Sequence, residues 1–172
     1  MELEQIFFWL LAFGAVFTSV LVVLPPGGKN PIFGALALIV SFFFVAGIYV
    51  LLVAHLMAAL QIMVYAGAIM VLFLFVIMLL NLSRRELGEE SKTFTQGLGA
   101  TAMLVIAIKA IVLVEATADG ISKRDMALSD GFGTVEAVAN MLFHDYLFPF
   151  ELAAVLLLVA IIGAVVLAKR TL

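Results

Sequence analysis

The sequence contains no cysteine and very little charge. Without cysteine, the chain forms no disulfide bond and holds no iron–sulfur cluster by its own thiolates, although the compartment is left open. Only 12% of the residues are charged and 66% are hydrophobic, with a mean hydropathy of +1.28. Soluble domains are usually about half apolar and a quarter charged. A chain of 172 residues with this balance is predicted to lie in a lipid bilayer.

Basic clusters are also missing, and the net charge is −3. This excludes nucleic acid as an expected partner. Near the N-terminus, Glu2 and Glu4 stand where a signal peptide would have basic residues, and no small-x-small cleavage site precedes Pro25. The first apolar segment is therefore expected to be a retained helix.

The long apolar stretches predict an all-α, polytopic bundle of about five transmembrane helices in a single membrane domain covering residues 1–172. A spanning helix needs about 20 apolar residues. As one helix, Pro31–Asn81 would be roughly 75 Å long, more than twice a hydrocarbon core of about 30 Å, so it must turn back near its most polar point, His55. The predicted spans are 5–24, 31–52, 57–81, 94–116 and 146–168. The outer loop 119–145 contains a possible amphipathic helix over 134–143.

The lysine and arginine residues of the loops predict the orientation. With five spans, one side receives six of these residues and the other only two. The six are Lys29, Arg84, Arg85, Lys92, Lys169 and Arg170, and the two are Lys123 and Arg124. The positive-inside rule then places the N-terminus outside and the C-terminus in the cytoplasm, or in the matrix of an organelle.

Polar and small residues in the third span are candidates for function. Gln61 and Tyr65 are four residues apart and are expected on one helix face, where they either order water along a proton path or hydrogen-bond a neighbouring helix. Gly67, between two alanines, either allows close approach of another helix or marks a π-bulge or hinge. Periodicity does not separate these alternatives.

Two charged residues lie in or near later spans. Lys109 is predicted about six residues from the outer end of the fourth span, near enough for its amine to snorkel or form a structural ion pair; a transport role is the alternative. Glu151 is predicted in the first turn of the fifth span, where a carboxylate suits the positive helix end as an interfacial anchor. No paired intramembrane carboxylates, activated nucleophile, phosphate loop or metal-ligand spacing occurs in the sequence, so no active site or cofactor of its own is expected.

Two motifs carry a family resemblance. The segment Gln61–Asn81, with its Val-Tyr-Ala-Gly-Ala motif, resembles the third helix of subunit J of proton-pumping NADH:quinone oxidoreductase, respiratory complex I. Leu142–Ala153, with Tyr-x-x-Pro-Phe-Glu, and the early segment Asn30–Leu36 resemble the same family. The resemblance covers most of the chain in order.

The resemblance implies a membrane-arm subunit beside the small subunit K, near the quinone-site end, in a bacterial inner membrane. Flavin, iron–sulfur clusters and quinone reduction would belong to partner subunits. In this family the third helix can carry a π-bulge around the positions of Tyr65 and Gly67, and the resemblance implies that switching between π and α forms opens and closes a water path toward the carboxylates of subunit K. Val71 and Phe73 would be the gating side chains. Some members have glutamate at the position of Gln61, and glutamine cannot ionise, so this position is not expected to carry protons itself but can still orient water.

Several related roles stay open from the sequence. Equivalent subunits occur in ferredoxin-linked quinone reductases, membrane-bound hydrogenases and multisubunit cation/proton antiporters. A non-pumping assembly scaffold is the alternative of a different class. An independent transporter is disfavoured because the predicted spans contain no buried charged pair.

Overall fold

The computed structural model describes residues 2–24, 31–80, 93–121 and 131–169, and these residues are almost entirely helical. The first two helices are α1 (Glu2–Val23) and α2 (Pro31–Leu51). A third, continuous helix runs from His55 to Leu80 and consists of α3 (His55–Leu60), the π-helix η1 (Gln61–Ile69) and α4 (Met70–Leu80). Then follow α5 (Thr93–Ile121), the short α6 (Val135–His144) and α7 (Leu147–Ala168). The all-α fold class predicted from the sequence is confirmed.

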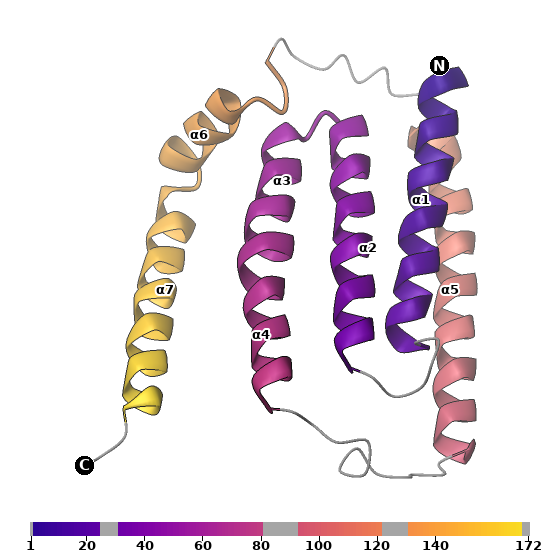
Figure 1. Ribbon diagram of the computed structural model, residues 1–172. Helices are drawn as coiled ribbons and strands as arrows, with labels where there is room; N and C mark the ends of the chain where they lie inside the picture. Colours follow the sequence, from indigo (N-terminus) through magenta and orange to yellow (C-terminus); the bar gives the residue numbers. More distant parts are fainter. Residues whose placement is uncertain (1, 25–30, 81–92, 122–130, 170–172) are drawn as a thin grey trace.

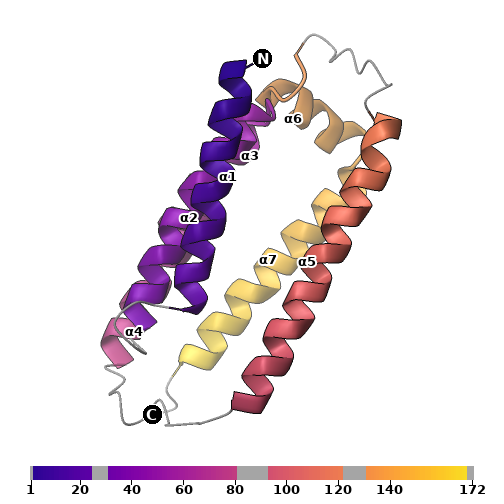
Figure 2. The ribbon, with the colours of Figure 1, turned by 90° about the vertical axis from the view of Figure 1, so that its right-hand side faces the viewer.

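Four of these helices are long and apolar enough to cross a membrane. They are α1, α2, the third helix and α7. The helix α5 has 29 residues and runs alongside them (Figures 1 and 2), but its crossing of the bilayer stays a prediction. The N- and C-terminal ends of the chain lie at opposite ends of the bundle (Figure 1). The side of the membrane to which each end belongs also stays a prediction, and most of the loop lysines and arginines behind it lie outside the described residues.

Several helix ends differ from the predicted ones. The helix α1 begins at Glu2 rather than at residue 5, because glutamate is a good helix former and its charge favours the positive helix end. The predicted end of the fourth span at residue 116 was too early, since α5 continues to Ile121. No proline interrupts those residues, and each added residue gains another backbone hydrogen bond, so a helix need not stop where its apolar segment stops.

The best-packed part of the chain is a layer formed by α1, α2 and the third helix, with α2 in the middle (Figure 1). Small residues allow α1 and α2 to approach closely: the ring of Phe44 lies so near Gly14 that a Cβ there would overlap it. Near this contact, the hydroxyls of Ser19 and Ser41 lie 3.1 Å apart, and Ser19 also donates to the Ala15 carbonyl at 2.7 Å. Paired hydroxyls of this kind can be buried between membrane helices without an unsatisfied group.

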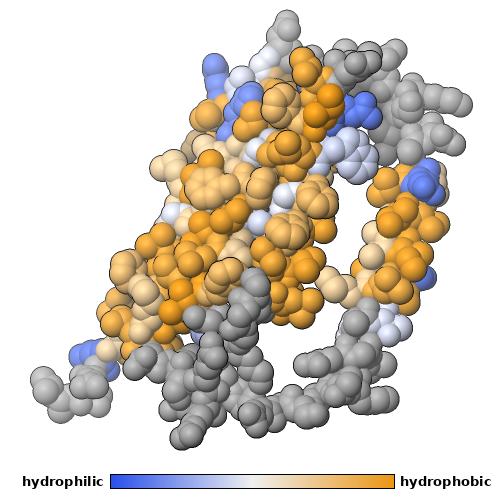
Figure 3. All heavy atoms as spheres, turned by 45° about the vertical axis from the view of Figure 1, so that its right-hand side comes forward, coloured by the Kyte–Doolittle hydropathy of each residue, from blue (hydrophilic) through white to orange (hydrophobic). Residues whose placement is uncertain are grey.

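The helices α5 and α7 stand apart from this layer. Within the described residues, α7 packs against α6 and α5 makes no comparable packing with any helix. Figure 2 shows both helices separated from α1 and α2, and the apolar side chains of α7 are exposed along its length. The space-filling view (Figure 3) shows a surface dominated by hydrophobic residues over the helices. Such a surface requires lipid or the apolar helices of other proteins around it.

Candidate functional site

The most unusual backbone in the described chain is the π-helix η1, nine residues in the middle of the third helix. The hydrogen bonding typical of a π-helix is seen at the end of η1, where the Met70 N–H donates to the Tyr65 carbonyl, five residues back. At its start, the Gln61 N–H still bonds three and four residues back, to Ala58 and Met57. The π-helix is rare, and it occurs frequently at functional sites. Of the two sequence interpretations of Gly67 and its neighbours, a local π defect is the one observed.

The π register decides which residues face α2. Along the third helix the buried residues are Ala58, Gln61, Ala66 and Met70. The step from Gln61 to Ala66 is five residues, whereas an α-helix repeats a face every three or four. The extra residue accommodated by the π turns therefore brings Ala66, rather than Tyr65, fully into the contact with α2.

Gln61 and Tyr65, which are predicted on one helix face, differ in burial. The side chain of Gln61 is only 9% exposed, while that of Tyr65 is 50% exposed. Tyr65 still contacts α2 through the edge of its ring, which meets the ring of Phe42 at 5.9 Å and 71°. The tyrosine thus lies at the border of the α2 contact, with its remaining surface free for a neighbouring molecule.

Gly67 faces away from α2 and is exposed. A Cβ added at Gly67 would lie 3.2 Å from the carbonyl oxygen of Ile62, in its own helix, and no atom of another helix in the described chain is within 4 Å. Close packing of a neighbouring helix, the other interpretation of Gly67, is not observed within the described residues of this chain. A side chain at Gly67 would instead press on the carbonyl five residues back in the same helix, which would have to shift by a few tenths of an ångström.

The two predicted gating residues lie in α4, directly after the π-helix. Val71 is 42% and Phe73 50% exposed. Because successive helical residues are about 100° apart, these two side chains point roughly 200° apart. One register can therefore present only one of them to a given neighbour.

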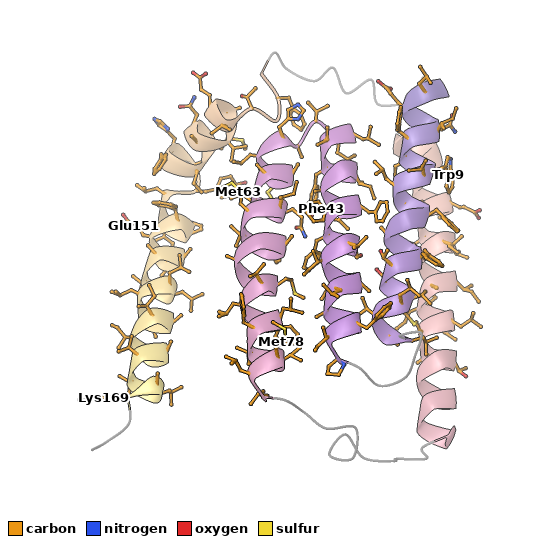
Figure 4. All side chains as sticks on the ribbon, viewed as in Figure 1. Trp9, Phe43, Met63, Met78, Glu151 and Lys169 are labelled. Atoms are coloured by element: carbon orange, nitrogen blue, oxygen red, sulfur yellow. The ribbon has the colours of Figure 1, made fainter. Side chains whose placement is uncertain are left out.

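Within the part of the chain that the structure describes, Lys109 and Glu151 are not brought to the π-helix, since α5 and α7 do not pack on the third helix there. Lys109 is exposed and lies twelve residues before the end of α5, about 18 Å along the axis, twice the predicted distance. Glu151 is the fifth residue of α7 and lies just after its first turn, rather than within it as predicted. Figure 4 shows Glu151 near the α6-bearing end of α7 and Lys169 at the other end.

Sequence reasoning missed the residues that hold the π-helix in place. Ala66 and Met70 bury the face toward α2, and Phe42 supplies the ring that meets Tyr65. The sequence drew attention to Ala66 only as one of the two alanines beside Gly67. A spacing of five between buried residues becomes visible only when the burial is known.

Comparison with known proteins places this geometry in a family. Residues 18–167 match the NADH-ubiquinone/plastoquinone oxidoreductase chain 6 family. The chain belongs to this family. It is 37% identical to NADH-quinone oxidoreductase subunit J of Rhodobacter capsulatus, over 95% of this chain and 80% of the relative. It is 36% identical to NAD(P)H-quinone oxidoreductase chain 6 of Synechocystis, over 98% of this chain and 82% of the relative.

The family also includes members with another electron donor in their names. The chain is 33% identical to F(420)H(2) dehydrogenase subunit J of Methanosarcina mazei, over 97% of this chain and 92% of that protein. The resemblance predicted from the Val-Tyr-Ala-Gly-Ala and Tyr-x-x-Pro-Phe-Glu motifs is confirmed. As a family member with helices suited to span a membrane, the chain is a multi-pass membrane subunit of a larger enzyme complex.

Proposed function

We propose that this chain couples quinone reduction to proton translocation in the membrane arm of a quinone oxidoreductase, through a change of register in its third helix. The observation that carries the proposal is the π-helix Gln61–Ile69 in a member of the chain 6 family. A π-helix is a local excess of one residue, so it can be lost by a change of hydrogen-bond register without breaking the helix.

The consequences of such a change follow from helix geometry. In an α register after Gln61, the face toward α2 would carry Tyr65 and Ile69 in place of Ala66 and Met70. The segment after the change would rotate by roughly 100° relative to the segment before it. Val71 and Phe73 would then exchange neighbours. An apolar side chain turned into a narrow passage excludes water from it, and turned away admits water.

The exposed side of the third helix is the expected place for the partner that supplies the proton-carrying groups. The described residues of this chain offer no buried acidic side chain at the π-helix, and Gln61 cannot ionise. A neighbour with intramembrane carboxylates is therefore needed, and the family resemblance implies subunit K. We place the complex in the bacterial inner membrane, with the N-terminus of this chain outside.

The chain itself is proposed to be non-catalytic and to bind no cofactor. Among the described residues, no group of three or more histidine, cysteine or acidic residues could hold a metal ion. The family resemblance implies that flavin and iron–sulfur clusters belong to partner subunits, and quinone to the complex. NADH is the electron donor in the name of the Rhodobacter relative and NAD(P)H in that of the Synechocystis relative, and the F(420)H(2) relative supports a related dehydrogenase as the second candidate.

The proposed function is tested with an affinity-tagged chain in its native membrane. We expect it to co-purify with the other subunits of a quinone oxidoreductase. We also expect its deletion to abolish proton uptake by inverted membrane vesicles during quinone reduction, with recovery from a plasmid-borne copy. Vesicles from the deletion strain that pump at the parental rate would refute the coupling role, and purification of the chain alone would refute the complex.

Glu151 is predicted to act as an interfacial or electrostatic residue rather than as a proton carrier. It is exposed, follows directly after Phe150, and Phe150 packs against Phe143 of α6 at 5.1 Å, so it lies at the α6–α7 junction and away from the π-helix. We expect Glu151→Gln to retain more than about half of the proton pumping, because exposed charge interactions contribute about 0–1 kcal/mol. Pumping is measured in vesicles with equal amounts of assembled complex. Near-complete loss in an assembled complex would assign Glu151 to the proton path.

A further inference from the structure

The turn between α2 and α3 holds the most strained residue of the described backbone. Val53 has φ 58°, the left-handed region that a β-branched side chain rarely enters. The Ala54 N–H donates to the Tyr49 carbonyl at 2.9 Å and the Val53 N–H to the Val50 carbonyl at 3.0 Å. These two bonds form a Schellman motif, and Val53 occupies the position that glycine usually takes. Strain of this kind persists only where surrounding structure imposes it.

The segment that covers this turn lies 80 positions further along the sequence, at Gly133. The backbone of Gly133 (φ 76°) lies directly against the Val53 carbonyl, so that a Cβ at Gly133 would collide with both the oxygen and the carbonyl carbon. Figure 1 shows the segment that precedes α6 descending to the top of α3 and α2, and Figure 2 shows the same proximity from the side. On its α1 side the turn borders a hollow of about 480 Å³ lined by Glu4 and Phe8. Support from α1 is therefore loose there.

The covering segment is itself held by hydrogen bonds. The Thr134 hydroxyl donates to the Gly131 carbonyl at 2.7 Å, and the Thr134 N–H donates to the same carbonyl at 3.1 Å. The same hydroxyl accepts from the Ala137 N–H at 3.2 Å and so caps α6. Residues 131–134 thus form a compact turn fixed to α6, which packs on α7.

We propose that Gly133 is a positioning residue that pins the α3 end of the third helix. This inference rests on the proposed function. A change of register in η1 rotates α3 and α4 relative to each other, and the half that is less constrained moves. The hydrogen bonds of the Schellman motif and the contact with Gly133 hold the α2–α3 turn, and with it α3, in place. The half that rotates is therefore α4, which carries Val71 and Phe73. Without the pin, α3 would turn instead and the gating residues would stay in place.

Two glycines of the same turn provide a matched test. Gly131 also has a positive φ, 89°, but a Cβ there would meet only the Thr134 hydroxyl at 3.8 Å. Gly131→Ala therefore carries the backbone strain alone, and Gly133→Ala carries the strain and the collision with Val53. Each variant is made in the full complex. Protons pumped per quinone reduced are measured in vesicles, and hydrogen–deuterium exchange of residues 52–57 in the purified complex.

We expect Gly133→Ala to speed exchange in this segment at least tenfold over Gly131→Ala, and to at least halve the protons pumped per quinone reduced. The rate of quinone reduction itself should stay within twofold of the parental rate, because the register change still occurs but rotates α3 instead of α4. The proposal is wrong if residues 52–57 exchange equally fast in the two variants. It is also wrong if they exchange faster in Gly133→Ala while the number of protons pumped per quinone reduced is unchanged. If Gly133→Ala does not assemble, one glycine inserted between Val53 and Ala54 loosens the same turn, and it must lower the proton ratio equally for the proposal to stand.

Failure of the pin and failure of the proposed function are distinguishable. If the unmodified complex reduces quinone without pumping, the proposed function fails. In that case, the difference in hydrogen–deuterium exchange of residues 52–57 between the Gly133 and Gly131 variants is the measurement that decides whether Gly133 holds the turn. If the unmodified complex pumps and both glycine variants keep the parental proton ratio, only the pin fails.

Discussion

Gly67→Val is expected to lower proton pumping and quinone reductase turnover together, by about five- to thirtyfold. A side chain at this position presses on the Ile62 carbonyl oxygen, since even a Cβ would lie at 3.2 Å and valine adds two methyl groups. Crowding of this kind costs about 1–3 kcal/mol, and one or two kcal/mol changes a two-state ratio by a factor of about 5–30. The contact belongs to the π turn, so the variant biases the third helix toward the α register and blocks the switch.

The matched control is Gly163→Val in α7. Gly163 also lies within a membrane helix, but a Cβ there would meet nothing within 4 Å among the described residues. It carries the same change in helix propensity without the carbonyl contact, and we expect both rates to stay within about twofold of the parent. Both activities are measured on vesicles normalised to assembled complex. A Gly67→Val complex with normal rates would remove the basis for the switch, and Gly67→Ala serves as the milder variant if valine prevents assembly.

Ala66→Leu is expected to destabilise the chain where the third helix meets α2. Ala66 is 4% exposed, and a leucine has no room there without separating the helices. Overpacking costs about 1–3 kcal/mol, which for a chain of this size corresponds to roughly 2–10 °C in the midpoint of thermal unfolding. The midpoint is measured on the detergent-solubilised complex, together with the amount of assembled complex in the membrane.

The control for this substitution lies two residues further along the same π-helix. Ala68 is exposed, and Ala68→Leu places the same side chain on the side away from α2. We expect Ala68→Leu to leave the midpoint within about 2 °C of the parent. In an α register the face toward α2 would instead fall on Tyr65, Ala68 and Ile69. A larger loss for Ala68→Leu than for Ala66→Leu would therefore show that the assembled complex holds the α register.

The site was only partly predictable from the sequence. Gly67 and its alanines were recognised as a place where the helix either packs closely or departs from α geometry, and helical periodicity is the same for both. Gln61 and Tyr65 were paired on one face, because four residues make one turn of an α-helix. The spacing did not predict how far each is buried, since the next buried residue after Gln61 is Ala66.

The sequence by itself determined that this protein lies in a lipid bilayer and that its fold is all-α. Long apolar segments without charge can be satisfied only as helices in a bilayer, since each helix bonds its own backbone groups. Proline and the charged connections then determined roughly where α1, α2, the third helix and α7 lie. The family followed from two motifs, since these depend on residue identity and order rather than on contacts.

Only the tertiary structure decided the local register and the contacts between distant segments. A π turn and an α turn differ by one residue in their hydrogen bonding, and the packing of Ala66 and Met70 against α2 selects between them. The strained turn at Val53 and its cover at Gly133 are 80 positions apart in the sequence. Their contact arises because residues 131–134, which precede α6, lie at the end of the bundle where α2 gives way to α3, and no local pattern encodes such a contact.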